Sequence, residues 1–206
     1  MNFLAHLLLA ESLTPNTSAS PETLLGAVLP DLHRGPLPEN LHPDTAAAVT
    51  QHQRIDAFTD THPAFANSKA RLTRLLQHPT AARFTAITID IVYDHLLCLD
   101  WPIYTDAPLA DYTRSVHQRL AQLNHNPSPR AAAALHRIRD TRLLELYATA
   151  QGLHTALERF SAYLSHRFAR TIDLTPAIDD LRDSLTGFRD DFADFFPQLQ
   201  RYAEPT

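Results

Sequence analysis

Apolar residues fill long stretches of the chain, and prolines stand between these stretches. Ser20-Pro21, Ser128-Pro129 and Thr175-Pro176 each place a capping hydroxyl before a proline, a pairing typical of the first turn of a helix. No segment alternates apolar and polar residues as a half-buried strand would. The pattern predicts helices at residues 2–13, 21–33, 44–61, 64–77, 80–100, 108–124, 129–150, 153–170 and 176–195.

Composition supports a helical interpretation. Four glycines against 15 prolines favour helices with abrupt ends over a series of tight hairpins. With 206 residues, 44% of them hydrophobic, the chain is long enough to form a real core. The predicted fold class is all-α, with residues 1–206 forming a single domain.

The charge balance limits the possible partners. Asp and Glu number 23 against 18 Lys and Arg, for a net charge of -5, which argues against a nucleic-acid-binding protein. The apolar start of the chain is short and contains His6, so it is a poor signal peptide, and no run reaches the ~18 apolar residues of a membrane span. With Cys98 as its one cysteine, the chain is predicted to be cytoplasmic and away from membranes.

Ionisable residues occur inside a segment that is apolar on every side. In residues 84–98, Asp90 and Asp94 lie one helical turn apart and His95 is adjacent, while the other side chains are mostly those of a central helix. Two carboxylates in an apolar setting are costly unless a cation joins them, and a divalent metal would do so. Pairing with a buried arginine, or capping of a neighbouring helix, is the alternative explanation.

A second group lies at helical spacing on one ridge. His52, Asp56 and Asp60 recur every four residues. Taken alone, this spacing is more typical of a solvated helix face. Ile55 and Phe58 flank the ridge, however, and place it at the border of the core.

Two further residues complete the set of candidates. His6 lies in an apolar first helix, where a single histidine is more often a hydrogen-bonded core residue than a ligand. Asp31 ends the apolar stripe of Leu24 and Val28 at a helix C-terminus, where it opposes the macrodipole and needs a partner. Together these groups have the composition of a hydrolytic metal site between packed helices.

Four blocks of the sequence, in order, resemble the acyl carrier protein phosphodiesterases, which are related to the HD-domain phosphohydrolases. The blocks are residues 1–7, 30–35, 52–60 and 89–97 followed by Trp101, and residues 190–197 resemble the family's ending. The chain departs from the family in having Leu8 where a second histidine is usual, Pro30 before Asp31, and Gln53 in place of a basic residue.

The resemblance implies an HD-domain-like helical bundle that depends on a divalent metal, with Mn²⁺ expected and Mg²⁺ or Fe²⁺ as alternatives. The implied reaction hydrolyses the phosphodiester that joins 4'-phosphopantetheine to the serine of holo-acyl carrier protein, giving the apo form. Holo-acyl carrier protein is therefore the expected protein partner and substrate.

The site hypothesis divides the candidates by role. The metal ligands are His6, Asp31, His52 and Asp94, the catalytic residues are Asp56, Asp90 and His95, and the substrate-binding residues are Arg34 and Arg54. The cation would activate a water, and a remaining carboxylate or His95 would orient that water or protonate the departing serine oxygen.

Two other functions fit the same residues. An HD-type phosphohydrolase acting on a nucleotide or small phosphoester would keep the metal and change the substrate. A helical module that binds carrier proteins or metal without turnover is the alternative from another class.

Overall fold

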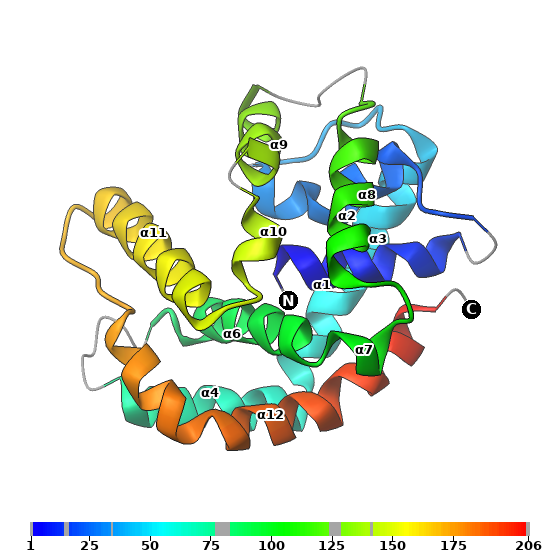
Figure 1. The fold of residues 1–206 in the computed structure, drawn as a ribbon. Coiled ribbons are helices and arrows are strands. Elements are labelled where there is room, and N and C mark those ends of the chain that lie inside the picture. Colours follow the sequence, from blue (N-terminus) through cyan, green and yellow to red (C-terminus); the bar gives the residue numbers. More distant parts are fainter. Residues whose placement is uncertain are drawn as a thin grey trace.

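The chain folds into helices joined by loops, and no strand occurs in the part of the chain that the structure describes (Figure 1). A computed structural model describes residues 2–14, 17–33, 35–76, 83–123, 129–140 and 142–204, with only the backbone described at 130, 137, 139, 140 and 176–184. The predicted all-α fold class is confirmed.

The helices follow the predicted order closely. They are α1 (Phe3–Ala10), the 3₁₀ helix η1 (Glu11–Leu13), α2 (Pro21–Leu32), α3 (Pro43–Thr61), α4 (Pro63–Leu75), α6 (Thr85–Leu99), α7 (Trp101–Tyr104), α8 (Leu109–Leu120), α9 (Pro129–Asp140), α10 (Leu143–Leu146), α11 (Ala150–Phe168) and α12 (Pro176–Ala203). Ser20 caps α2 as predicted, since its hydroxyl accepts a hydrogen bond from the Thr23 amide. The predicted Thr175 cap is wrong, because its hydroxyl donates to Asp173 instead. Ser128 lies outside the described residues.

Two predicted helix boundaries are wrong. The helix expected over 129–150 is divided into α9 and α10, and Arg142 between them takes a left-handed backbone conformation with φ 48°. The last helix does not stop at 195 but continues through Pro197 to Ala203. Burial of Phe195, Phe196 and Leu199 holds this turn helical although the proline lacks an amide donor.

The first helix lies at the centre of the fold, in contact with α2, α3, α6 and α12. Its Asn2 makes no side-chain cap, and the carboxylate of Asp94 on α6 takes that place. The two Asp94 oxygens accept hydrogen bonds from the amides of Leu4 at 2.9 Å and Ala5 at 3.1 Å. An anion at this end also favours the helix dipole. This contact fixes α1, and with it His6, relative to α6.

Aromatic side chains join α12 to the helices around it. Tyr93 of α6 packs edge-to-face against Phe192, with ring centroids 5.0 Å apart, and Phe65 of α4 packs against Tyr93 in the same way. Gln51 of α3 donates to the carbonyl oxygens of Leu9 and Ala203, and so ties α3 to α1 and α12.

Among the described residues, no helix combines the length and apolarity that a membrane crossing requires.

Candidate metal centre

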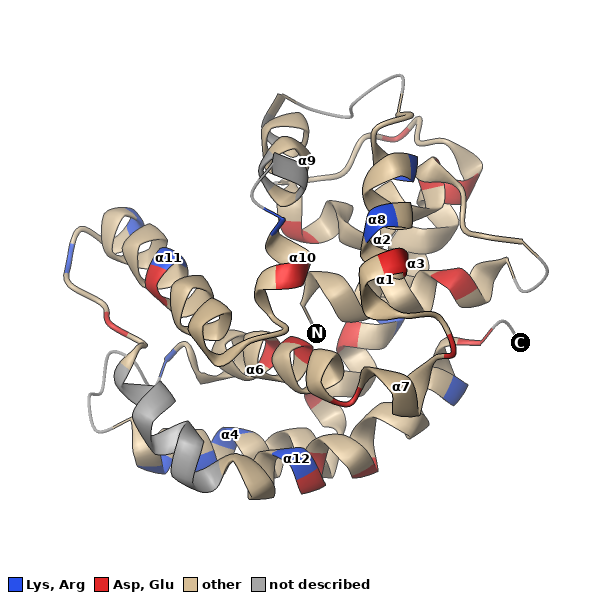
Figure 2. Ribbon diagram, viewed as in Figure 1, with Lys and Arg blue, Asp and Glu red and all other residues tan. Residues whose placement is uncertain are grey.

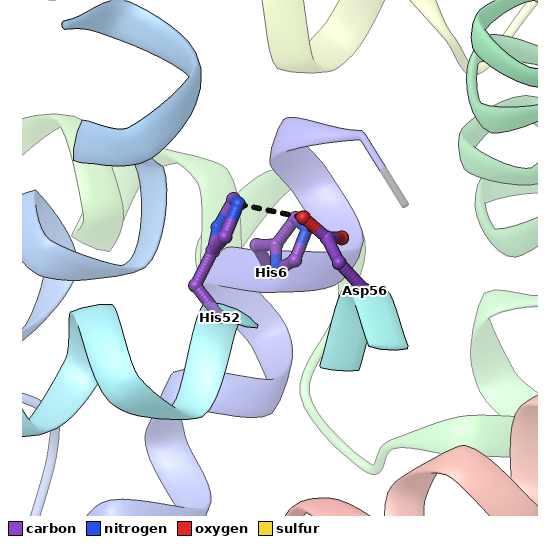
Figure 3. Close-up of side chains that lie close together, drawn as sticks. All are labelled: His6, His52 and Asp56. Atoms are coloured by element: carbon purple, nitrogen blue, oxygen red, sulfur yellow. Dashed lines mark ion pairs between the residues drawn. The ribbon is translucent and has the colours of Figure 1, made fainter. Parts of the chain in front are cut away.

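Three side chains from two helices converge where α1 crosses α3. His6 Nε2 lies 3.2 Å from Asp56 Oδ1, and His52 Nε2 lies 3.0 Å from Asp56 Oδ2. The two imidazole rings stack with centroids 3.8 Å apart (Figure 3). Both rings are buried, whereas the Asp56 side chain is 41% exposed, so the group faces outward on one side only. We call His6, His52 and Asp56 the metal-site triad.

A close approach of α2 to α3 orients His52. Gly26 permits this approach, because a Cβ there would lie 2.3 Å from the Thr45 carbonyl oxygen. The next residue, Ala27, presents its carbonyl oxygen 2.7 Å from His52 Nδ1. Because a carbonyl only accepts, Nδ1 carries the proton, and Nε2 points its remaining position toward Asp56.

Burial and neighbouring charges set the pKa values of the triad. Burial lowers the pKa of His6 to about 3, so its imidazole is neutral at pH 7. Burial also acts to lower the pKa of His52, but the carboxylates of Asp56 and Asp31 outweigh it and raise that pKa. Although burial opposes it, the two histidines lower the pKa of Asp56, so this carboxylate is ionised. The triad therefore offers two imidazoles and one carboxylate anion.

Two more carboxylates lie close to the triad. Asp31 Oδ1, at the end of α2, lies 3.9 Å from His52 Nε2, and burial raises the pKa of Asp31 to about 6. Asp90 on α6 faces the same cavity as Asp31, and burial raises its pKa as well. This cavity has a volume of about 670 Å³ and lies between α2, α6, α9, α10 and α11. The structure thus brings four of the seven ligand and catalytic candidates together and places Asp90 on the wall of the adjoining cavity.

Asp94 and His95 have other partners. Both oxygens of Asp94 accept amides of α1, which is the helix-capping role considered as an alternative from the sequence. His95 Nδ1 lies 2.6 Å from the Tyr147 carbonyl oxygen, and burial lowers the pKa of this histidine. Neither belongs to the triad, so their contacts support roles in positioning α1 and the segment after α10.

The arginine candidates lie apart from the triad. Arg54 donates to the Tyr202 carbonyl oxygen at 3.3 Å, and its guanidinium lies over the Tyr202 ring, 5.1 Å from the centroid. Arg34 lies outside the described residues. Among the residues that Figure 2 colours, Lys and Arg are spread over several helices, including α4, α8, α11 and α12.

None of the nine predicted site residues lies in the second half of the chain, yet that half forms much of the cavity. Tyr147, which follows α10, and Phe160 of α11 both line it. Asn2, also on the wall, donates from Nδ2 to the Tyr147 hydroxyl at 2.7 Å. Aromatic residues on a helix usually belong to a core, so the sequence offered no signal that these face an open space.

The triad has the chemistry of a divalent-metal site. Its three ligand atoms lie within 4.8 Å of one another. Among the described residues, this is the group of histidines and acids close enough together to share one metal ion. In the described part of the chain, His6 Nδ1 is buried without a hydrogen-bond partner, and Nε2 is buried beside Asp56 Oδ1, where ligation of a cation shared with that carboxylate would satisfy it. Imidazole nitrogen and carboxylate oxygen together suit Mn²⁺, Fe²⁺ and Zn²⁺. The residues present therefore fit a bound cation.

Comparison with known proteins identifies the family. The sequence model of the acyl carrier protein phosphodiesterases matches residues 1–199. This chain belongs to that family. The acyl carrier protein phosphodiesterase of Enterobacter sp. (strain 638) is 26% identical over 205 residues, covering 99% of this chain and 98% of that protein. That of Serratia proteamaculans is 28% identical over 207 residues, with the same coverage of 99% and 98%.

A third relative is more similar over a shorter stretch. The enzyme of the same name from Photorhabdus laumondii is 34% identical over 119 residues, which cover 56% of this chain and 54% of that protein. No solved structure matches this chain. The resemblance found in the sequence blocks is thus confirmed at the level of the family, while the kinship with HD-domain proteins stays a prediction.

Proposed function

We propose that this protein is a divalent-metal-dependent phosphodiesterase that removes 4'-phosphopantetheine from the serine of holo-acyl carrier protein. The observation that carries the proposal is the metal-site triad in a chain whose residues 1–199 match this family. Mn²⁺ is the cation we propose, since carboxylate and imidazole ligands suit it and the resemblance implies it.

The chain's own residues supply binding and proton transfer. His6, His52 and Asp56 would hold the cation, with Asp31 close enough to join them. A bound cation supplies Lewis-acid activation of the attacking water and charge neutralisation at the phosphate. The Ala27 carbonyl keeps His52 in the tautomer whose Nε2 faces the site.

Asp90 is our proposed general acid for the departing serine oxygen. Burial raises its pKa, and a carboxylic acid must hold its proton near neutral pH to act in this way. Asp90 faces the cavity that also contacts Asp31, next to the triad. Because Asp94 and His95 are engaged with backbone groups, we assign them positioning roles rather than direct contact with the phosphate.

We further propose that residues 1–206 form one catalytic domain that works in the cytoplasm. Buried residues from α1 through α12 belong to a common hydrophobic core, which supports the first part. A lone, buried Cys98 is consistent with a reducing compartment.

The direct test is turnover of the carrier protein. Purified protein is incubated with holo-acyl carrier protein and Mn²⁺, and intact-mass spectrometry follows loss of the arm. Release of 4'-phosphopantetheine with formation of the apo form is the expected result, and EDTA should stop it. An arm that stays attached under Mn²⁺, Mg²⁺ and Fe²⁺, while a simple phosphodiester is cleaved, would show that the substrate assignment is wrong.

A further inference from the structure

The cavity beside the metal-site triad is lined by both acidic and apolar residues. One end reaches Asp31, whose Oδ1 lies 3.9 Å from His52 Nε2. The other lining residues are mainly apolar and aromatic, and include Phe160 and Tyr163 from α11 and Ile91 from α6. In Figure 1, α6 lies below the angle between α11 and the α9–α10 pair.

Part of the wall is open to solvent. Ile87 is 43% exposed and Tyr163 is 42% exposed, although both line the cavity. Ala156, in contrast, is a buried residue of the cavity wall. The cavity is therefore open on the α6–α11 side, and it is also open near the triad, where the Asp31 side chain is 39% exposed.

We propose that this cavity binds the pantetheine arm of the substrate, with the arm's phosphate at the triad and its uncharged chain between α6 and α11. The inference rests on the proposed function and specifies where the substrate lies. It makes Ile87, Ala156 and Phe160 determinants of arm recognition, a role that the sequence blocks did not suggest.

The chemistry of the cavity fits this occupant. A volume of about 670 Å³ falls within the range of small-molecule sites, about 300–1,000 Å³. The arm carries charge only at its phosphate, and the rest is a flexible chain with a dimethyl group, two amides and a thiol. Apolar walls with a few polar groups, such as the Asn2 amide and the Tyr147 hydroxyl, suit such a chain.

A nucleotide fits the cavity less well. Extra phosphates would meet the carboxylate of Asp31, and Arg159 is the sole Lys or Arg among the described lining residues. Like charges at short range disfavour such a ligand. A single phosphate at the triad and an uncharged arm avoid this repulsion.

Two cavity variants and one matched control test the proposal. Ala156→Phe fills the cavity, Ile87→Ala removes part of its wall, and Ile103→Ala truncates an isoleucine that is 72% exposed on α7, outside the cavity. Each Mn²⁺-loaded protein is assayed with holo-acyl carrier protein and with bis(4-nitrophenyl) phosphate, which has no arm. For Ala156→Phe, kcat/KM for the carrier protein divided by kcat/KM for bis(4-nitrophenyl) phosphate should fall about tenfold or more.

Smaller effects are expected elsewhere. Ile87→Ala should raise KM for the carrier protein about threefold to tenfold with kcat little changed, since it removes binding contacts only. Ile103→Ala should match wild type on both substrates. An unchanged ratio in Ala156→Phe, whether both activities persist or both fall equally, would overturn the proposal.

A binding measurement separates this inference from the proposed function. S-methyl pantetheine lacks the phosphate and a free thiol, so it cannot ligate the cation through either group. Calorimetric titration should detect its binding to wild type and at least tenfold weaker binding to Ala156→Phe. Equal binding to both proteins would refute the cavity assignment, whereas failure of wild type to release the arm would refute the proposed function instead.

Discussion

Asp56 joins the two imidazoles of the metal-site triad, because one of its oxygens faces each ring. Its negative charge stabilises the two stacked imidazoles and supplies the anionic ligand of the site. The same spacing of histidine and acid does not form such a site elsewhere in the described chain. His154 and Glu158 on α11 are also a histidine and an acid four residues apart, 3.3 Å from each other, but their side chains are 40% and 55% exposed.

Asp56→Asn should keep the shape of the side chain and remove its charge. We expect Mn²⁺ affinity to fall by about 10–100-fold and turnover of the carrier protein by about 100-fold or more. Isothermal titration calorimetry and the mass assay measure these changes. Glu158→Gln is the matched control and should change neither. Wild-type affinity and turnover in Asp56→Asn would remove the triad from the mechanism.

Mn²⁺ binding should weaken as the pH falls through about 6. The pKa of Asp31 is raised to about 6 by burial and that of His52 is raised by its acidic neighbours, so protons compete with the cation for these groups in mild acid. His6, with a pKa of about 3, stays neutral and does not contribute. Each displaced proton costs about tenfold in affinity per pH unit below its pKa. Titrations at pH 8, 7, 6 and 5 measure the slope, and a flat profile would contradict this assignment.

At the scale of helices, the site depends on two close contacts: α2 against α3, and α6 against the start of α1. The first lets the Ala27 carbonyl reach His52, and the second holds His6 in place through Asp94. Both contacts involve backbone groups, so they position whole helices rather than single side chains.

Gly26→Ala should destabilise the protein by about 1–3 kcal/mol, the usual cost of overpacking. Its Cβ would lie 2.3 Å from the Thr45 carbonyl oxygen, a backbone atom that moves only if α3 moves. Gly187→Ala is the matched control, because its Cβ would meet only the flexible end of the Arg71 side chain. Urea unfolding compares the two. Equal stability of both variants would show that α2 and α3 tolerate separation.

Asp94→Ala should lower the free energy of unfolding by about 1–3 kcal/mol, because the buried amides of Leu4 and Ala5 lose their acceptor. Asp111→Ala, which breaks an exposed ion pair with Arg114, should stay within about 0.5 kcal/mol of wild type. Denaturant unfolding and Mn²⁺ titration are measured together. Unchanged stability with loss of Mn²⁺ binding would make Asp94 a ligand instead of a cap.

For the whole molecule, the triad links α1 to α3, so a cation bound there should stabilise the entire fold. At a free Mn²⁺ concentration of about 100 times Kd, mass action predicts about 2.7 kcal/mol of added stability. Differential scanning fluorimetry should therefore show a Tm that rises with Mn²⁺ and returns with EDTA. Asp56→Asn should lose most of this shift, and a shift that persists in that variant would place the cation elsewhere.

The sequence by itself determined the helical fold class, most helix starts and the family. Helical periodicity and proline-marked caps are local, so they can be read without knowledge of contacts. The spacing of His52 and Asp56 on one helix likewise fixed their proximity, because residues four apart share a helix face.

Only the tertiary structure decided which acids meet the histidines. Asp90 and Asp94 have the same spacing as His52 and Asp56, yet Asp94 faces the amides of α1 while Asp90 faces the cavity. The direction of each helix face depends on which neighbours pack against it, and Gly26 and the α1 amides set that packing. The cavity was beyond the sequence for the same reason, since its walls come from helices far apart in the chain.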